Sequence, residues 1–386
     1  MQRSSCSMST HRIPTLTIVL LALLSMARAQ TSTPAEAIAL EQKGDLPQAA
    51  DAWRSFIAAH PRDAAAYASL GVVLARQQRY PEAVTAYKKA LSLDSKLPGI
   101  ELNLGLAEFK QGHFRAAIVP LKAVVARDAG NVQARTLLGL SFYGDKQFAE
   151  AVATLKVVVQ ANPDNAQLQQ VMAQSCLWSG QYQCALDGFQ QILRTQPNSA
   201  AAHVLIGEAL DGMGKTQEAI AEFKLAAQVA PREPNVHFGL GFLYWKLHEY
   251  EKAKEEFQTE LANDADNAQA WAYLGDTEMK LGNREKATSG INKALQLRND
   301  IRLAYIDRGI LLSEENKHKD ALADFRKAIA LDPEQPDAHY RLARAYQALG
   351  ESSEAEKEFA LARQLRQELD TKLTPKMSSA PPALQP

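Results

Sequence analysis

Residues 234–267 carry two short runs of apolar and small residues, each with the spacing of one helix face. The first run has members at i, i+3, i+4 and i+7, namely His237, Leu240, Gly241 and Tyr244. After a break, Ala253 and Phe257 follow four residues apart. The pattern predicts two short helices joined by a tight turn. Because neither helix could bury its apolar face alone, such a unit must pack against neighbouring units.

The same unit recurs every 34 residues without insertion or deletion. Positions at this interval from Gly241 all hold glycine or alanine: Ala37, Gly71, Gly105, Gly139, Ala173, Gly207, Gly275, Gly309 and Ala343. Positions at this interval from Ala253 all hold alanine. Positions at this interval from Phe257 all hold a large apolar residue: Trp53, Tyr87, Leu121, Leu155, Phe189, Phe223, Ile291, Phe325 and Phe359. Three coincident columns indicate tandem repeats over residues 30–369.

This pattern resembles the tetratricopeptide repeat, a helix-turn-helix unit with the motif W-x2-L-G-x2-Y, then A-x3-F, then P. The seventh unit carries it as His237, Leu240, Gly241 and Tyr244, followed by Ala253 and Phe257. Some units lack the closing proline, and Glu108 and Glu278 replace the apolar residue at the tyrosine position. The resemblance implies an all-α fold, a right-handed α-solenoid (superhelix) of ten helix-turn-helix units.

The glycine column has a physical cost that the fold must offset. Glycine inside a helix costs about 1 kcal/mol relative to alanine, yet seven of the ten units keep glycine there. We expect the two helices of a unit to approach closely at this point. The glycine would face the alanine column, and the large residue one turn later would fill the remaining gap.

The two ends of the chain differ in composition from the repeats. Residues 1–29 combine a basic start, a short apolar run and an A-x-A sequence at Ala27–Ala29, which indicates an export signal removed before Gln30. An uncleaved membrane anchor is the alternative, although the run is shorter than the ~20 residues that a span needs. Residues 370–386 are rich in Pro, Ser and Ala, which predicts a disordered tail. We therefore expect an exported protein, periplasmic or secreted, with no later membrane span.

Charge and motif content argue against several function classes. Without residues 1–29, 40 basic residues face 44 acidic ones, and no basic block or stripe occurs, which argues against a nucleic-acid partner. The run Gly214-Lys215-Thr216 is similar to the end of a phosphate-binding loop, but Ala209 stands where that motif requires glycine. No Ser/His/Asp or Cys/His arrangement stands out, and the repeats leave no room for a catalytic domain. We expect no catalytic residues, no cofactor and no enzyme activity.

Cys176 and Cys184 are the only cysteines after residue 29, and both lie in the fifth unit. Cys176 is near the end of the first helix of the unit, and Cys184 is in the first turn of the second. Two interpretations stay open: a Cys176–Cys184 disulfide, which an exported protein can form, or two buried thiols at small-residue positions.

A column of flat rings holds His203, His237, Trp271, Tyr305 and His339. Three histidines in register could suggest a metal site. We instead expect a flat, semi-polar ring to stack between units, because no cysteine or carboxylate set has ligand spacing nearby.

In proteins of the tetratricopeptide repeat family the first helices line a concave face. Positions two, five, nine, twelve and thirteen of each unit point inward there. The residues that we expect to contact a partner at these positions are Phe109, Tyr143, Gln174, Trp178, Phe242 and Trp245. Farther along, Glu208, Asp211 and Asp276 are expected to make the wall acidic. Packing against neighbouring first helices is the alternative for these side chains, and we favour exposure for Phe109, Trp178 and Trp245.

These features indicate a non-enzymatic protein–protein interaction scaffold that binds a peptide or protein segment in the concave groove, outside the cytoplasm. The alternative is a polysaccharide-secretion or carbohydrate-binding scaffold, because similar exported repeat proteins serve in polysaccharide secretion and stacked aromatic side chains can bind sugar rings. A comparison of protein capture with glycan binding separates the two.

Overall fold

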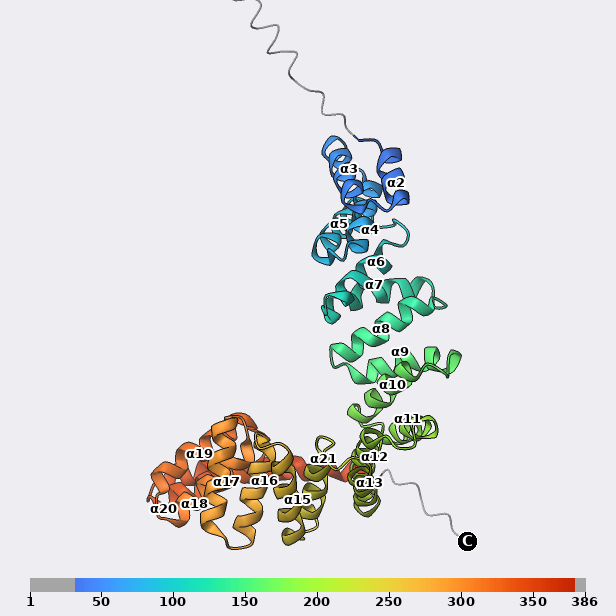
Figure 1. Ribbon diagram of the computed structural model, residues 1–386. Helices are drawn as coiled ribbons and strands as arrows, with labels where there is room; N and C mark the ends of the chain where they lie inside the picture. The colour runs from blue at the N-terminus through green and yellow to red at the C-terminus, as the bar shows by residue number, and fades with distance from the viewer. Residues whose placement is uncertain (1–31, 379–386) are drawn as a thin grey trace, which may run out of the picture. The chain divides into compact units, whose positions relative to one another are not determined.

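The computed structural model describes residues 32–378, with the side chains of residues 32–369. This part of the chain holds twenty helices, α2 to α21, and no strand (Figure 1). The helices confirm the predicted all-α fold. The predicted export signal lies outside the described residues. Among the helices described, none combines the length and the apolar character needed to cross a membrane.

The helices fall into two compact units, with the boundary between Pro163 and Asp164. The first unit holds α2 (Pro34–Lys43), α3 (Leu46–Ala59), α4 (Ala64–Arg76), α5 (Tyr80–Leu93), α6 (Ile100–Lys110), α7 (Phe114–Arg127), α8 (Val132–Gly144) and α9 (Phe148–Ala161). The second unit holds α10 (Ala166–Trp178), α11 (Tyr182–Thr195), α12 (Ala200–Gly212), α13 (Thr216–Val229), α14 (Val236–Lys246), α15 (Tyr250–Asn263), α16 (Ala268–Lys280), α17 (Arg284–Leu297), α18 (Arg302–Glu314), α19 (His318–Leu331), α20 (Pro336–Ala348) and α21 (Ser352–Ser378). The first unit therefore contains repeats one to four, and the second contains repeats five to ten.

Local sequence signals set the helix ends. Thr33 caps α2 through a reciprocal pair of hydrogen bonds with Glu36, and Pro34 opens the first turn. Several first helices have an Asp, Asn or Ser cap whose side-chain oxygen accepts a backbone N–H, as Asn267 does for α16. The turn between paired helices needs a positive φ. Glycine supplies it in most repeats, and residues such as Lys146 (φ 60°) take the same conformation elsewhere.

The glycine column lies directly against the large residue of the same repeat. A Cβ built on Gly207 would lie 2.7 Å from the ring of Phe223, and one built on Gly309 would lie 2.5 Å from the ring of Phe325. Both separations are below what real Cβ atoms show, so only glycine fits. The predicted close approach is confirmed. The nearest side chain is the large residue, whereas the alanine column presents its backbone: the Ala219 carbonyl oxygen is 3.4 Å from the Cβ position of Gly207.

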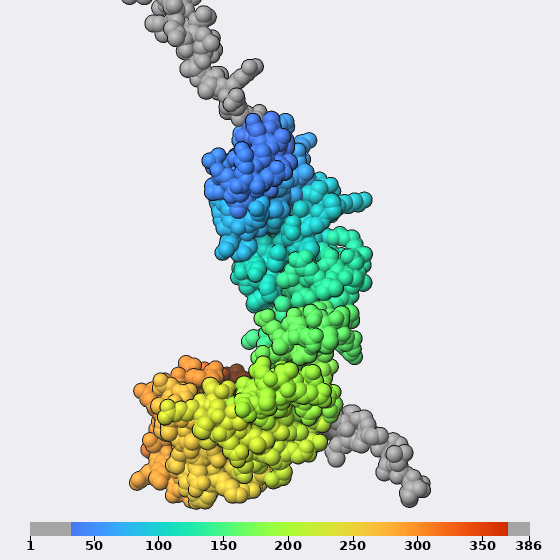
Figure 2. Space-filling view, turned by 45° about the vertical axis from the view of Figure 1, so that its right-hand side comes forward, coloured from blue at the N-terminus to red at the C-terminus, as the bar shows by residue number. Residues whose placement is uncertain are grey.

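The large residues of this column form the centre of each helix pair. Tyr87, Phe257 and Phe325 are at most 1% exposed. Burying such side chains stabilises each by roughly 1.5–3 kcal/mol. The second unit, coloured from green through yellow to red in Figure 2, forms a continuous mass of atoms.

The last helix is longer than the sequence predicted. α21 runs to Ser378, whereas we expected the ordered array to end at residue 369 and a disordered tail to follow. No glycine or proline interrupts residues 352–374, and Lys372 and Leu373 are good helix formers. The helix therefore continues past the last repeat into the stretch that we expected to be a disordered tail, and the domain boundary at residue 369 stays a prediction. Residues 379–386 lie outside the described part of the chain.

Candidate partner-binding site

The six predicted contact residues divide between the two units. Phe109 and Tyr143 belong to the first unit. The Phe109 ring packs edge-on against Phe114, with centroids 5.5 Å apart, and Tyr143 packs in the same way on Phe148 at 6.1 Å. Both predicted rings are half-buried. Each therefore supports the start of the second helix of its own repeat instead of standing free as an anchor.

A pocket of about 260 Å³ lies in the first unit between α4 and α6. Its lining is mostly apolar, with two basic residues: Val72, Tyr80, Leu106, Arg76 and Lys110. Several of these side chains occupy repeat positions that we expected to face inward. The predicted Phe109 and Tyr143 do not line this pocket.

In the second unit, α10 carries Gln174 and Trp178. Gln174 is half-buried, and Trp178 is 48% exposed, which makes it the most exposed of the six predicted residues. Trp178 thus lies where sequence analysis placed it, at the surface near the end of a first helix.

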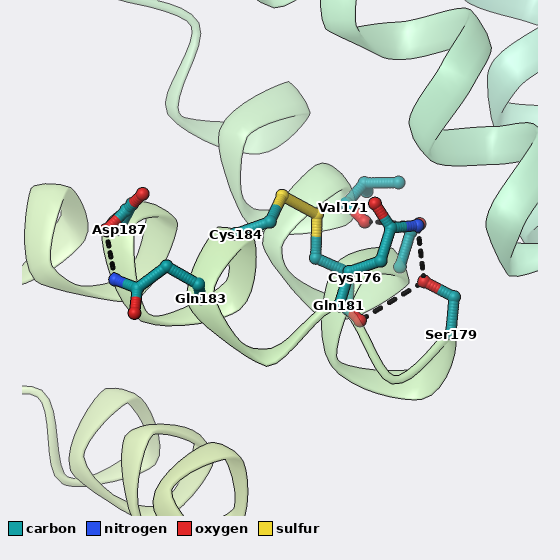
Figure 3. Close-up of a disulfide and its surroundings, with 8 residues drawn as sticks. Val171, Cys176, Ser179, Gln181, Gln183, Cys184 and Asp187 are labelled. Atoms are coloured by element: carbon teal, nitrogen blue, oxygen red, sulfur yellow. Dashed lines mark hydrogen bonds between the residues drawn. A yellow bond between two sulfur atoms is a disulfide. The ribbon is translucent and has the colours of Figure 1, made fainter. Parts of the chain in front are cut away.

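A disulfide joins Cys176 of α10 to Cys184 of α11, with Cα atoms 5.7 Å apart (Figure 3). Beside it, the Ser179 hydroxyl donates to the Cys176 carbonyl oxygen at 3.2 Å, and the Gln181 amide donates to that hydroxyl oxygen at 3.0 Å. Cys176 is fully buried. The cross-link fixes the helix pair of repeat five at its turn.

Phe242 and Trp245 of α14 come together with a third ring, Tyr273 of α16. Phe242 and Trp245 are stacked, with an interplanar angle of 17° and centroids 6.1 Å apart. The Tyr273 ring meets both edge-on, at 5.5 and 5.3 Å. Burial, aided by the charges of Asp276 and Asp307, raises the pKa of Tyr273. We call Phe242, Trp245 and Tyr273 the aromatic cluster.

Tyr273 was not predicted as a contact residue, because it occupies the sixth position of its repeat and the positions expected to face inward are the second, fifth, ninth, twelfth and thirteenth. Its contact with two predicted residues is long-range and follows from the stacking of α14 on α16. An aromatic residue directly after an inward position, as Tyr273 follows Ala272, is the only sequence signal that could have identified it.

Polar side chains border the aromatic cluster, and their charges differ from the acidic wall that the sequence predicts. The Trp245 indole N–H donates to Asp276 Oδ2 at 2.5 Å. Lys280 lies 3.8 Å from the other oxygen of Asp276, and Lys246 pairs with Asp211 at 2.6 Å. Lysines therefore offset the charge of two of the three predicted acids, and the wall is less acidic than expected. Glu208, the third predicted acid, is exposed at the surface of α12.

Next to this border, Asp307 of α18 is buried, with only 2% of its surface exposed, and its Oδ2 atom has no hydrogen-bond partner. Burial and the neighbouring Asp276 carboxylate raise its pKa well above the ordinary value, and Lys280 and Arg341 act in the opposite direction. Folding therefore places a carboxyl group where its charged form is disfavoured.

Asp307→Asn is expected to stabilise the fold at neutral pH by about 1–3 kcal/mol, because it removes a buried unpaired carboxyl group. Since the folded-state pKa is raised, stability falls as the pH rises above the unfolded-state value of about 4. The gain should therefore shrink toward zero near pH 4. Urea denaturation at both pH values measures it, with exposed Asp266→Asn as control. An equal gain in stability at both pH values, or no gain at neutral pH, would contradict the raised pKa of Asp307.

The column of flat rings has a structural role. His237 Nδ1 lies 2.6 Å from Glu256, and its Nε2 lies 3.1 Å from the Pro231 carbonyl oxygen. Trp271 and Tyr305 likewise donate to backbone carbonyl oxygens six residues earlier. These contacts tie the start of each first helix to the preceding loop. Over the described residues, no group of three or more His, Cys, Asp or Glu is arranged to hold a metal ion.

Comparison with known proteins agrees with this architecture. Models of the tetratricopeptide repeat match residues 35–98, 108–175, 142–209, 212–272 and 336–368, and a TPR repeat model matches residues 309–350. No curated protein matches the sequence significantly.

Several solved structures are similar to parts of this chain. A tetratricopeptide repeat protein from Parabacteroides merdae is 16% identical, with a TM-score of 0.52 over 64% of this chain and 97% of its own. MamA is 22% identical, with a TM-score of 0.37 over 43% of this chain and 97% of its own. YrrB, described as a TPR protein with an unusual peptide-binding site, is 21% identical. Its TM-score is 0.38 over 49% of this chain and 97% of its own. With repeat matches spread over most of its length, the chain belongs to the tetratricopeptide repeat family.

Proposed function

We propose that this chain is a non-enzymatic scaffold that binds a peptide or protein segment at the aromatic cluster on the concave face of its second unit. The observation that carries the proposal is the meeting of three rings from two adjacent first helices. Phe242 and Trp245 occupy inward positions, and both are half-buried, so part of each ring remains accessible.

The chemistry of the aromatic cluster suits a protein segment. Large rings supply apolar contact area, and tryptophan and tyrosine are enriched among the residues that dominate binding energy. Here the rings are held by one another and by the Trp245–Asp276 hydrogen bond, so little side-chain freedom is lost on binding. The ammonium of Lys246, which pairs with Asp211, lies over the Phe242 ring, 5.7 Å from its centre.

A display library of random peptides selected against residues 30–386 tests the proposal. Selected peptides should bind the double variant Phe242→Ala, Trp245→Ala at least tenfold more weakly, a loss of about 1.4 kcal/mol or more. The control is Trp271→Ala, which also removes a tryptophan from the second unit but outside the aromatic cluster. Melting temperatures of both variants show whether the fold is retained. Equal binding by the double variant and the control would refute the proposal.

Carbohydrate binding is the alternative function, and it calls for an aromatic face open to a sugar ring. Phe242 and Trp245 stack on each other and receive the edge of Tyr273, which favours a peptide over a sugar here. A glycan array probed with the same variants separates the two functions. Glycan binding that depends on Trp245, with no peptide selected, would favour the alternative.

We further propose that the chain acts outside the cytoplasm. The proposal rests on the sequence of residues 1–29 and is compatible with the disulfide of repeat five. Mass spectrometry of the protein from its native host should show Gln30 as the first residue. A chain that retains residues 1–29 in the cytoplasmic fraction would contradict export.

A further inference from the structure

Two pockets meet at Tyr340 in the second unit. One, of about 350 Å³, lies between α18 and α20 and is lined by Ser313, His318, Tyr340, Arg341 and Arg344, among others. The other, of about 720 Å³, is lined by Tyr340, Phe359, Ala362, Arg363 and Arg366. The Tyr340 ring is 43% exposed. One accessible aromatic ring thus contributes to both hollows.

Four arginines line these pockets, and we call Arg341, Arg344, Arg363 and Arg366 the arginine cluster. All four are exposed, and within residues 32–369 none of them has a carboxylate at ion-pair distance. Nearby arginines differ: Arg308 pairs with Asp324 at 2.6 Å, and Arg302 pairs with Asp337. Four guanidinium groups in two pockets that share Tyr340, with no carboxylate among residues 32–369 at ion-pair distance, make a positive region in a chain whose net charge is negative.

Two acidic residues near the arginine cluster, Glu314 and Asp307, do not neutralise it. Glu314 lines the first pocket, but its carboxylate accepts from Arg284 at 2.9 Å. Asp307 faces Arg341 from α18, but it is buried and its pKa is raised, so it is a weak counter-charge. His318 adds a buried Nδ1 atom that has no hydrogen-bond partner among the described residues. Over residues 32–369, the pockets therefore keep positive charge that no carboxylate at ion-pair distance offsets.

We propose that the arginine cluster and Tyr340 bind an acidic segment of a partner protein. Carboxylates of the segment would pair with the planar guanidinium groups, which accommodate two-point contacts, and an apolar side chain would lie on Tyr340. We choose an acidic segment because its negative charge complements the positive charge of the arginine cluster. Residues 1–31 contain no Asp or Glu, and residues 370–386 contain a single one, Asp370, so neither end of the chain can supply an acidic segment. The inference rests on the proposed function, because it assumes that the second unit receives a protein segment.

A labelled synthetic peptide in which glutamate alternates with leucine and phenylalanine provides the test, read by fluorescence anisotropy on residues 30–386. The acidic peptide should bind at least tenfold more tightly than its glutamine counterpart. Arg341→Gln with Arg344→Gln should reduce its affinity at least tenfold. The matched control, Lys224→Gln with Arg232→Gln, removes the same charge from exposed positions of the second unit outside both pockets, and should change the affinity less than threefold.

Other occupants give different results in the same assay. Equal loss in the control variant, or equal binding of the glutamine peptide, overturns the proposal. Displacement of the peptide by millimolar inorganic phosphate, or tighter binding of a short RNA, also overturns it in favour of a phosphate ligand. If removal of residues 379–386 tightens peptide binding, the occupant of the pockets is the chain's own end. If the chain self-associates in sedimentation in a way that depends on the arginines, the occupant is a second copy.

The aromatic-cluster variant keeps the two proposals distinguishable. If Phe242→Ala with Trp245→Ala abolishes the binding of library-selected peptides while the Arg341→Gln, Arg344→Gln variant binds every peptide normally, the proposed function stands and the acidic-segment site fails. If the acidic peptide binds through the arginines while no library peptide depends on Trp245, the proposed site at the aromatic cluster fails instead.

Discussion

Gly207→Leu is expected to destabilise the chain by about 3 kcal/mol or more, although leucine is the better helix former by about 1 kcal/mol. The reason is the position of the Phe223 ring. A Cβ on Gly207 would lie 2.7 Å from that ring on one side, and a Cβ on Gly239 of the next repeat would lie 2.2 Å from it on the other. Because the ring is held between two glycines, it cannot move away from a new side chain.

Urea denaturation followed by circular dichroism measures this effect. Ala201→Leu is the matched control, since Ala201 is exposed on the same helix, α12, and its replacement should change stability by less than about 0.5 kcal/mol. The double variant Gly207→Leu, Phe223→Ala should lose less unfolding free energy than the two single variants lose when their losses are added. Equal shifts for Gly207→Leu and Ala201→Leu would refute the packing role of the glycine column.

Reduction of the Cys176–Cys184 disulfide is expected to lower stability by about 2–3 kcal/mol. The two residues are eight positions apart, and closing a loop of that size removes freedom mainly from the unfolded chain. The stabilisation should disappear with dithiothreitol in the native chain and be absent in Cys176→Ala with Cys184→Ala, whose stability should not respond to the reductant.

Peptide mass mapping without reduction identifies the bond directly. A linked pair of peptides containing Cys176 and Cys184 is the expected result, and the same peptides with two free thiols would contradict it. Mass mapping therefore decides between the two interpretations that the sequence leaves open, a disulfide or two buried thiols. The stability measurement gives the same answer, because two free thiols would not make the stability sensitive to a reductant.

Much of the fold could be predicted from the 34-residue period alone. The columns through Gly241, Ala253 and Phe257 identify the helix pairs, and their small and large residues meet as the period requires. The boundary at Pro163 could not be predicted, because the spacing continues through it without insertion. The extension of α21 to Ser378 was missed because the composition of the last residues outweighed the helix formers that precede Pro375.

The candidate site was predicted only in part, for a physical reason. A position in the repeat predicts which way a residue points, but it does not predict which side chains it contacts. Phe109 and Tyr143 occupy positions expected to point inward, yet they pack on Phe114 and Phe148 of their own repeats. Tyr273 joins Phe242 and Trp245 from the next repeat, and only the stacking of first helices brings the three together. The arginine cluster could not be predicted, because a sequence does not show which arginines have an ion-pair partner among the described residues.

Hydroxyl-radical footprinting of residues 30–386, with and without a library-selected peptide, tests the central claim most directly. We predict that the peptide lowers the oxidation rate of Phe242, Trp245 and Tyr273 several-fold. Tyr250, which lies on a second helix, should be oxidised at an unchanged rate. Protection of Tyr250 with no change at Trp245 would place the peptide on another face of the repeats and contradict the account.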